Sequence, residues 1–274
     1  MRSIFRIFAL VVRYFYLIKT SFPRILELMY WPTFQMILWG LISKHLTNSN
    51  DTIIQIGGVL IAGVLLWDIL FRSQLGFSIS FLEEIWSRNL GQLFVSPLKP
   101  LELVLSLMTI SFIRTTIAMI PAALLAIPLY SFSLFQMGLS LMFFFTSLLM
   151  TGWILGIFII AAIIRFGVAA ESLAWGAIFT LAPLSAVYYP VETLPEWIRW
   201  LSLSFPQTYV FEGMREVLFS NNFNSNYFIK SIILNIIYAI IAVIVFLVSF
   251  EGARKRGGLI TVSYTHLRAH ETKA

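Results

Sequence analysis

Long apolar stretches constrain this chain more than any other feature of its sequence. Stretches long enough to cross a bilayer, about 20 residues each, recur along the chain. They cover residues 25–45, 53–72, 101–130, 134–164, 171–190 and 229–250. Each segment must satisfy its own backbone hydrogen bonds in hydrocarbon, and continuous apolar runs lack the alternation of barrel strands. We therefore expect an all-α membrane protein of about six transmembrane helices.

The composition narrows the classes of site that this chain can carry. It is 59% hydrophobic and only 12% charged, and soluble domains carry roughly twice that charged fraction. Without cysteine it has no disulfide framework, thiolate nucleophile or thiolate metal site. Of the three histidines, two lie in the last nine residues. We expect no catalytic, cofactor-binding or metal-ligating residues in this chain.

The basic residues are scattered along segment ends, although the formal charge is +6. With the N-terminus inside, most of them fall on the cytoplasmic side: Arg2, Arg6, Arg13, Lys19, Arg24, Arg72, Arg88, Lys99, Arg165, Arg254, Lys255 and Arg256. Only Lys44, Arg199, Arg215 and Lys230 fall outside. This asymmetry predicts cytoplasmic N- and C-termini, and the scatter favours membrane topology over a nucleic-acid partner.

The first residues have the pattern of a helix that lies on the membrane surface. At 100° per residue, Arg2, Arg6 and Arg13 fall within about 40° of one another on a helical wheel. An amphipathic N-terminal interfacial helix on an anionic surface explains this clustering. The alternative is a frayed terminus whose arginines only mark the cytoplasmic side.

The polar connection over residues 74–100 has helical features of its own. Ser80-Phe-Leu-Glu83 has the form of a capping box and predicts a short cytoplasmic helix from Ser80 to about Phe94. Leu82, Ile85, Trp86, Asn89 and Leu93 recur at helical spacing on one face, and Glu83, Glu84 and Arg88 charge the other. Such a helix is either a docking element for a soluble partner or a connector lying on the surface.

A second connection, residues 189–230, is expected on the outside. Pro190 is expected to end the fifth span, and Thr193-Leu-Pro-Glu196 is another capping-box pattern. Trp197 and Trp200 follow on one helical face, Phe205-Pro206 breaks the helix, and a second amphipathic piece runs from Thr208 to Phe219. This predicts a re-entrant helical hairpin dipping into the outer interface, with a plain external loop as the alternative.

Ionisable residues within the spans are the remaining candidates for function, since they cost several kcal/mol in a bilayer. They are Arg114, Glu171, Asp68 and Glu27. An ion pair of Arg114 with Glu171 or Asp68 that serves packing is one interpretation, and a substrate or proton site is the other.

No energy source is visible in the sequence. It contains no Gly-x-x-x-x-Gly-Lys-Ser/Thr nucleotide loop and no His-Glu-x-x-His motif. If the chain pumps a substrate, a partner must supply the work. Two hypotheses compete with a pump driven by a partner: a secondary, ion-coupled transporter, and a membrane-embedded enzyme or assembly factor.

Two longer motifs carry a resemblance to a known family. The first is Glu83-Glu-Ile-Trp-Ser-Arg-Asn-Leu-Gly-Gln-Leu-Phe-Val-Ser-Pro-Leu-Lys-Pro-Leu-Glu102. The second comprises Pro183-Leu-Ser-Ala-Val-Tyr-Tyr-Pro-Val-Glu-Thr-Leu-Pro-Glu-Trp-Ile-Arg-Trp200 and Phe205-Pro-Gln-Thr-Tyr-Val-Phe-Glu-Gly-Met-Arg215. Together they resemble the type-2 ATP-binding-cassette (ABC) exporter permeases, over a transmembrane domain of residues 1–260.

The resemblance implies a role for each segment between the spans. Residues Arg2 to Lys19 would form an elbow helix, and the Ser80 helix would contact a separate ATPase subunit through Glu83, Glu84, Trp86, Arg88 and Asn89. Thr193 to Phe219 would be the external hairpin, with Glu192, Pro195, Trp197, Trp200 and Pro206 as its marked residues.

The resemblance also implies partners. Two permeases, as a homodimer or as a pair of different chains, would work with two ATPases in the bacterial inner membrane. Such pairs export lipids, polysaccharides, drugs or other amphiphiles, and ATP and Mg are bound by the partner subunits.

The last residues depart from that family pattern. After Gly257-Gly-Leu-Ile260, residues 261–274 are polar and unlike the rest of the chain. They resemble a read-through or assembly artefact, so we exclude them from functional interpretation.

Overall fold

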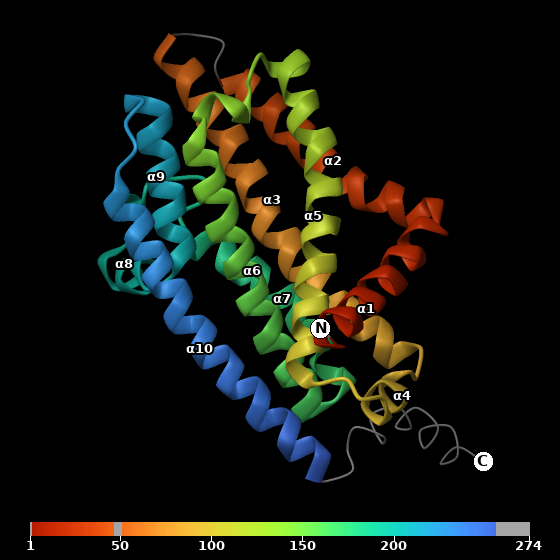
Figure 1. The fold of residues 1–274 in the computed structure, drawn as a ribbon. Coiled ribbons are helices and arrows are strands. Elements are labelled where there is room, and N and C mark those ends of the chain that lie inside the picture. The colour runs from red at the N-terminus through yellow and green to blue at the C-terminus, as the bar shows by residue number, and fades with distance from the viewer. Residues whose placement is uncertain (1, 47–50, 256–274) are drawn as a thin grey trace, which may run out of the picture.

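A computed structural model describes residues 2–46 and 51–255, and these residues form helices and short connections with no strand (Figure 1). The atypical tail, residues 261–274, lies outside the described residues. The α-helices are α1 (Arg2–Lys19), α2 (Phe22–Leu46), α3 (Asp51–Trp86), α4 (Leu90–Val95), α5 (Pro100–Tyr130), α6 (Leu139–Phe166), α7 (Ser172–Leu184), α8 (Glu196–Leu203), α9 (Pro206–Ser220) and α10 (Ser225–Lys255). The 3-10 helices are η1 (Leu134–Met137), η2 (Val168–Glu171) and η3 (Val191–Thr193).

Five of the predicted spans are long apolar helices. Within the described residues, α2, α3, α5, α6 and α10 are each long and apolar enough to cross a membrane. The sixth, predicted over 171–190, is shorter: the apolar helical segment covers Ala169–Leu184, about 24 Å at 1.5 Å per residue. Pro190 does not end it, because the helix stops six residues earlier and Ala186 then adopts a left-handed conformation, with φ of 53°.

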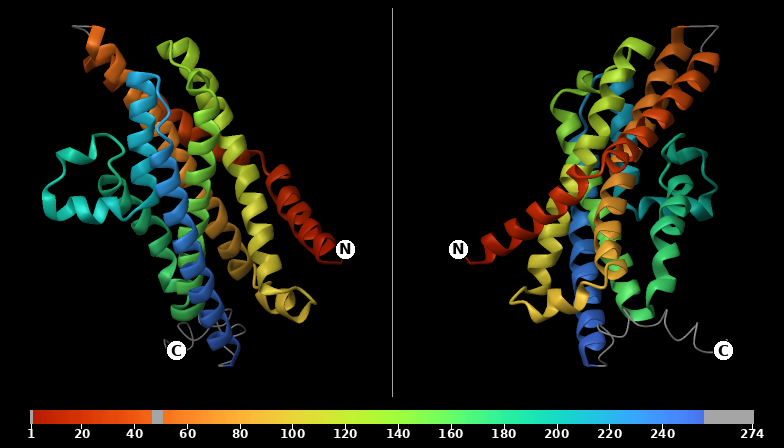
Figure 2. Two further views of the ribbon diagram at one scale, coloured as in Figure 1. Left: turned by 60° about the vertical axis from the view of Figure 1, so that its left-hand side comes forward. Right: turned by 90° about the vertical axis from the view of Figure 1, so that its right-hand side faces the viewer.

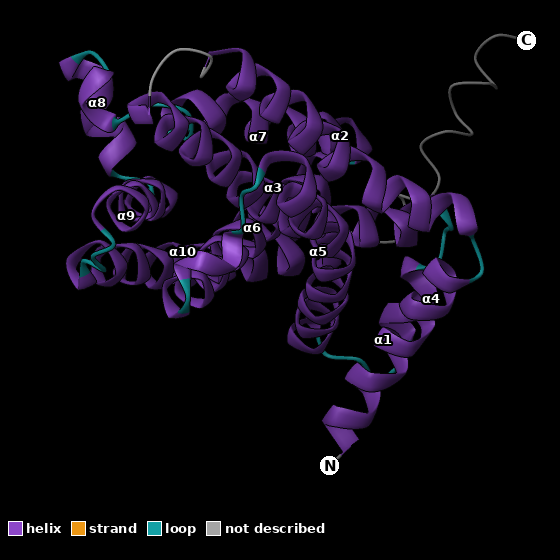
Figure 3. Cartoon of the chain, turned by 90° about the horizontal axis from the view of Figure 1, so that it is seen from above, coloured by secondary structure: helices purple, strands orange, loops and turns teal. Residues whose placement is uncertain are grey.

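Helix α3 is the centre of the bundle. Of its spanning window 89% is buried, against 22% for α10 and 17% for α2. Around it lie α2, α5, α6 and α9, as the view from above shows (Figure 3). Glycines on α6 allow the closest approach to α3, where a Cβ added at Gly152 would lie 2.7 Å from the Leu70 carbonyl oxygen. Packing against α3 therefore positions the other helices.

Short polar side chains tie the helices together inside the bundle. The Ser111 hydroxyl of α5 donates to the Ser73 carbonyl of α3 at 2.6 Å, and the Trp153 indole of α6 donates to Ser111 at 3.1 Å. Between α6 and α10, Thr151 donates to the Asn235 side chain at 2.9 Å. Buried hydroxyl and amide groups thus find partners on a neighbouring helix, as membrane helices require.

The short helix predicted from Ser80 to Phe94 does not exist as one element. Ser80 lies inside α3, where its hydroxyl donates to the Gly76 carbonyl at 2.7 Å, so it caps nothing. Helix α3 continues to Trp86, a turn follows, and only the six residues of α4 form the connector helix. The capping-box pattern misled because a serine with a free hydroxyl bonds equally well to the preceding turn of its own helix.

The second connection folds into two helices, as predicted, but with a different start. Thr193 lies in η3 and its hydroxyl donates to the Pro190 carbonyl at 2.8 Å, so no capping box opens α8. The predicted break at Phe205-Pro206 is confirmed, because Pro206 is the first residue of α9. Figure 2 shows η3 and α8 projecting from the side of the bundle, while α9 packs within it.

Helix α1 is amphipathic as predicted, but its arginines face the protein. Ile4 and Phe5, each 71% exposed, and Phe8, 64% exposed, lie on its outer face. Arg6 and Arg13 instead form ion pairs with Glu102 and Glu84. The side chain of Arg2 is outside those described. The apolar face is thus the one offered to the bilayer, and the arginine face meets carboxylates of the chain itself.

Replacing Gly152 tests the packing of α6 on α3. We expect Gly152→Ala to lower the stability by about 1–3 kcal/mol, because the added methyl group meets backbone atoms that cannot move aside. Thermal unfolding in detergent, followed by tryptophan fluorescence, measures it. Gly176→Ala in α7 is the control, since nothing lies within 4 Å of its added Cβ. A midpoint for Gly152→Ala equal to that of the control would contradict the packing described.

Candidate functional site

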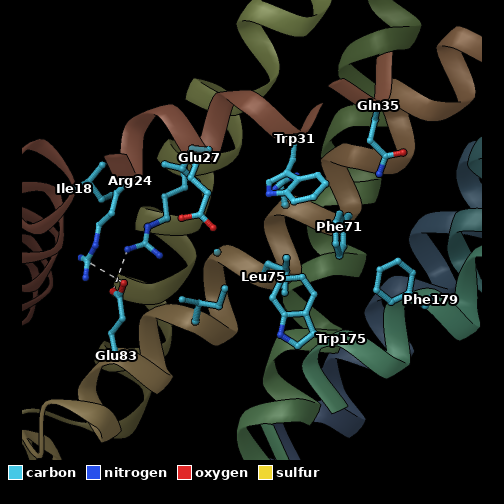
Figure 4. Close-up of a pocket in the computed structure, with 15 residues that line it drawn as sticks. Ile18, Arg24, Glu27, Trp31, Gln35, Phe71, Leu75, Glu83, Trp175 and Phe179 are labelled. Atoms are coloured by element: carbon cyan, nitrogen blue, oxygen red, sulfur yellow. Dashed lines mark hydrogen bonds and ion pairs between the residues drawn. The ribbon is translucent and has the colours of Figure 1, made fainter. Parts of the chain in front are cut away.

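A cavity of about 560 Å³ lies between α2, α3, α5 and α7. Figure 4 shows its lining side chains, with charged groups toward one end and aromatic rings toward the other. The charged members are Arg24, Glu27, Arg72, Glu83 and Arg114, and the aromatic ones are Trp31, Phe71, Trp175 and Phe179. Ile18, Leu28, Gln35, Leu75, Gly76 and Ile79 complete the wall. The cavity is therefore amphipathic along its length.

Glu83 is the central charge of the polar end. One carboxylate oxygen lies 3.1 Å from Arg114 Nη2 on α5, and the other lies 3.5 Å from Arg24 Nη1 on α2. The Arg114 side chain is only 7% exposed and that of Glu83 17%, so the pair is poorly screened by water. One carboxylate of α3 therefore holds two neighbouring helices.

The partner predicted for Arg114 was wrong. Arg114 pairs with Glu83 rather than with Glu171 or Asp68. Glu171 ends η2 and is the N-cap of α7. Asp68 is fully buried in α3, and neither of its carboxylate oxygens has a hydrogen-bond partner among the described residues. Because Glu83 was assigned to a surface helix, it was not considered as a partner for an arginine inside a span.

Arg72 and Glu27 line the same cavity without an ion pair. No carboxylate of the described residues lies within 4.0 Å of the Arg72 guanidinium, whose carbon atom lies 5.3 Å from the centroid of the Phe71 ring. Figure 4 shows Glu27 pointing down from α2 into the cavity. The predicted intramembrane charges Arg114 and Glu27 thus lie at one site, which Arg72 and Glu83 complete.

Glu84, next to Glu83, points to the other side of α3. Its carboxylate lies 2.9 Å from Arg13 of α1 and accepts a hydrogen bond of 2.6 Å from the Asn89 amide. Its side chain is 1% exposed. Burial, and then the carboxylate of Glu84, raise the pKa of the Tyr14 hydroxyl on α1. Glu84 therefore connects α1 to the α3–α4 turn. Its carboxylate is buried and is not available on the surface to contact an ATPase.

A third carboxylate fastens the start of α1. Glu102, in the first turn of α5, lies 3.2 Å from Arg6 and accepts a hydrogen bond of 3.0 Å from the Lys99 backbone N–H. The Ser3 hydroxyl donates to the same side chain, and Arg6 also donates to the Pro97 carbonyl. The elbow helix is thus bound at two points to the segment around α4. Sequence reasoning missed Glu102, although Pro100 at the first helical position places this glutamate at N3, where its side chain can reach the N-cap N–H.

Two of the predicted coupling residues are exposed on the α3–α4 turn. Trp86 is 52% exposed at the end of α3. Arg88 is exposed and adopts a left-handed conformation with φ of 55°, which costs free energy for a residue with a side chain. Of the five residues predicted to contact an ATPase, these two have the exposure that a contact requires, and Glu83 and Glu84 are engaged within the chain.

The residues predicted to mark the external hairpin fall into two groups. Trp197 and Trp200 are 77% and 81% exposed on α8, whereas Pro206 is buried at the start of α9 and accepts a hydrogen bond of 2.8 Å from Ser231. Pro195 is the N-cap of α8, and the Glu192 carbonyl accepts a hydrogen bond of 2.7 Å from Arg199.

Arg215, expected on the outside, is buried within that hairpin. It donates to the Ala186 carbonyl at 2.8 Å and pairs with Glu212 at the same distance. Glu212 also accepts a hydrogen bond of 2.7 Å from the Val191 N–H. The pair satisfies backbone groups in the connection from the end of α7 to the start of η3. An arginine three residues after a glutamate was the signal available in the sequence.

The described residues contain no group of three or more His, Asp or Glu side chains that could hold a metal ion. The cavity instead places charged side chains beside aromatic rings, an arrangement that suits binding of a molecule with both polar and apolar parts.

Comparison with known protein families identifies the chain. The family model of the ABC-2 type transporters matches residues 6–219. The chain belongs to that family. It is thus a membrane permease component that pairs with an ABC ATPase subunit, and not itself the ATPase. No curated protein matches the sequence.

A charge exchange tests the pair at the polar end of the cavity. We expect Arg114→Glu to destabilise the chain by about 3 kcal/mol, because it leaves two carboxylates facing each other in a poorly screened site. Adding Glu83→Arg should recover part of this loss. The recovery is partial because Arg24 then faces an arginine. Thermal unfolding in detergent and the yield of folded protein measure both.

Glu171→Arg in the Arg114→Glu background is the matched control. It introduces the same charge on α7's N-cap, away from the pair, and should restore nothing. Equal recovery by both second substitutions would show that only net charge matters and that the Glu83 contact is dispensable.

Proposed function

We propose that this chain is the permease subunit of an ATP-driven exporter, working beside a second permease and with two separate ATPase subunits. The family match over residues 6–219 supports the proposal, because a membrane component of an ABC-2 type transporter needs an ABC ATPase to work. The absence of a nucleotide-binding loop in the sequence agrees with that division of work. ATP and Mg bind to the partner.

The α3–α4 turn is the surface that we assign to the ATPase. Trp86 and Arg88 are exposed there, and the turn lies at the end of the bundle where α10 also ends (Figure 1). Two residues before Trp86, α3 carries Glu84 toward α1, and one residue earlier Glu83 faces the cavity. A displacement of the turn therefore reaches the elbow helix and the cavity through a single continuous helix.

A second permease would complete the pathway. The cavity has walls from α2, α3, α5 and α7, while Trp31, Trp175 and Phe179 in its lining remain 48%, 45% and 65% exposed. Large rings exposed at the mouth of a cavity are suited to a facing surface of similar kind. Closure by a second permease would turn a one-sided cavity into a passage between two chains.

The orientation follows from the basic residues. Arg88, Lys99, Arg165 and Arg254 all lie at the same end of the bundle as α4, which we place in the cytoplasm of a bacterium. Both described ends of the chain then belong to that side of the inner membrane, which is where an ATPase would bind.

Copurification tests this assignment. The tagged chain, extracted from native membranes, is expected to bring down a subunit with Walker motifs and vanadate-sensitive ATPase activity. Arg88→Glu should reduce the recovered activity at least tenfold without lowering the yield of permease, because it reverses the charge of an exposed side chain. Quantifying ATPase per permease by mass spectrometry and phosphate release measures the effect.

Lys230→Glu provides the control, since this exposed lysine lies near the start of α10, whereas the α3–α4 turn lies at the end of the bundle where α10 ends. It should leave ATPase recovery unchanged. Transport that persists when ATP is depleted and collapses with a protonophore would instead support a secondary carrier and overturn the proposal.

A further inference from the structure

The cavity between α2, α3, α5 and α7 separates charge from apolar surface along its length. Arg24 and Glu83 lie at one end in Figure 4, and Phe71, Trp175 and Phe179 lie at the other. On α2 the lining runs from Arg24 to Gln35, about 16 Å at 1.5 Å per residue. A molecule that fills this space has a charged head and an extended apolar body.

The sign of the head follows from the charges in the lining. Three arginines and two glutamates face the cavity, which leaves one positive charge in excess. Arg24 and Glu27 are both exposed, so their opposite charges are screened to a similar degree. The excess positive charge therefore comes from the less exposed groups, where Arg72 and Arg114 face Glu83.

Arg72 is the cation available to a ligand. Arg24 and Arg114 are both committed to Glu83, but no ion pair of the described residues includes Arg72. Its Nε is buried without a hydrogen-bond partner. Two carboxylates act on Arg72 without forming an ion pair with it: Asp68, one turn earlier on α3 and outside the cavity lining, and Glu27 of α2, which lines the cavity. The planar guanidinium can donate two parallel hydrogen bonds to a phosphate or carboxylate.

The aromatic end provides the second half of the site. Phe71 lies with its ring centroid 6.2 Å from that of Trp175 and 6.0 Å from that of Phe179, joining α3 to α7. Trp175 and Phe179 are 45% and 65% exposed, so their ring faces can be covered by a ligand. Because the Arg72 guanidinium stacks over Phe71, the cationic and aromatic parts meet at one point.

We propose that this cavity binds an anionic amphiphile, with its phosphate or carboxylate head at Arg72 and its apolar body against Phe71, Trp175 and Phe179. The inference rests on the proposed function in treating the cavity as part of a transport pathway. It goes further by naming the chemical class of the occupant and the residue that selects its charge.

Quenching of tryptophan fluorescence tests the proposal directly. The full chain is placed in phosphatidylcholine nanodiscs, and a dodecyl phosphate brominated near the end of its chain is added as the probe. We expect saturable quenching, because Trp175 and Trp31 line the apolar end. Unbrominated dodecyl phosphate should reverse the quenching, whereas a hundredfold excess of inorganic phosphate should not.

Two variants locate the site. Arg72→Gln should raise the half-saturating probe concentration at least tenfold, and Phe179→Ala should raise it at least threefold while leaving the fold intact, because Phe179 is exposed. Arg165→Gln is the matched control, since Arg165 also stacks on a neighbouring phenylalanine, Phe166, but is exposed at the end of α6. It should change the concentration less than twofold. Thermal unfolding verifies that each variant is folded.

Three results would overturn the inference. They are equal quenching by a brominated dodecyltrimethylammonium, full displacement by inorganic phosphate, or unchanged binding in both folded variants. Phosphatidylglycerol in the nanodiscs, if it competes with the probe, assigns the site to an anionic lipid head; if it does not, the ligand is a single-chain amphiphile. The assay needs neither ATP nor a partner, so binding without ATP-dependent transport would contradict the proposed function alone.

Discussion

The ion pairs of Glu83 are the interaction on which the arrangement of this membrane domain depends. A carboxylate in α3 that is 17% exposed and meets arginines from α5 and α2 joins three helices at one point. A charge there is tolerated in a bilayer only with partners, so each of the three helices needs the other two. The same contact forms the polar wall of the cavity, which ties the packing of the bundle to the site it encloses.

The sequence predicted the spans well because hydrocarbon imposes its requirement on each helix separately. Five long helices appear where apolar runs predict them, and the break at Pro206 follows from local chemistry. The boundaries of α3 could not be predicted in this way. Polar residues such as Ser80 and Glu84 were interpreted as surface, although contacts with α1 and with the preceding turn of α3 satisfy them inside the protein.

The candidate site was predictable only in part for the same reason. Arg114 and Glu27 were identified as charges within spans, but their partners come from helices distant in sequence. Arg13 and Glu84 are 71 residues apart, and Arg6 and Glu102 are farther still. Periodicity within one helix gives no information on which helix it faces. The family resemblance implies general roles for these segments, but the pairings between helices become visible only in the folded structure.

Adjacent carboxylates on α3 have a mechanical consequence. Successive residues of an α-helix are about 100° apart, so Glu83 and Glu84 point in different directions. Glu83 forms ion pairs with α5 and α2, whereas Glu84 forms one with α1. Turning α3 about its own axis would stretch both sets of ion pairs at once. The helix is therefore held against rotation about its axis, and under the proposed ATPase contact a push at the α3–α4 turn would travel along it as a translation.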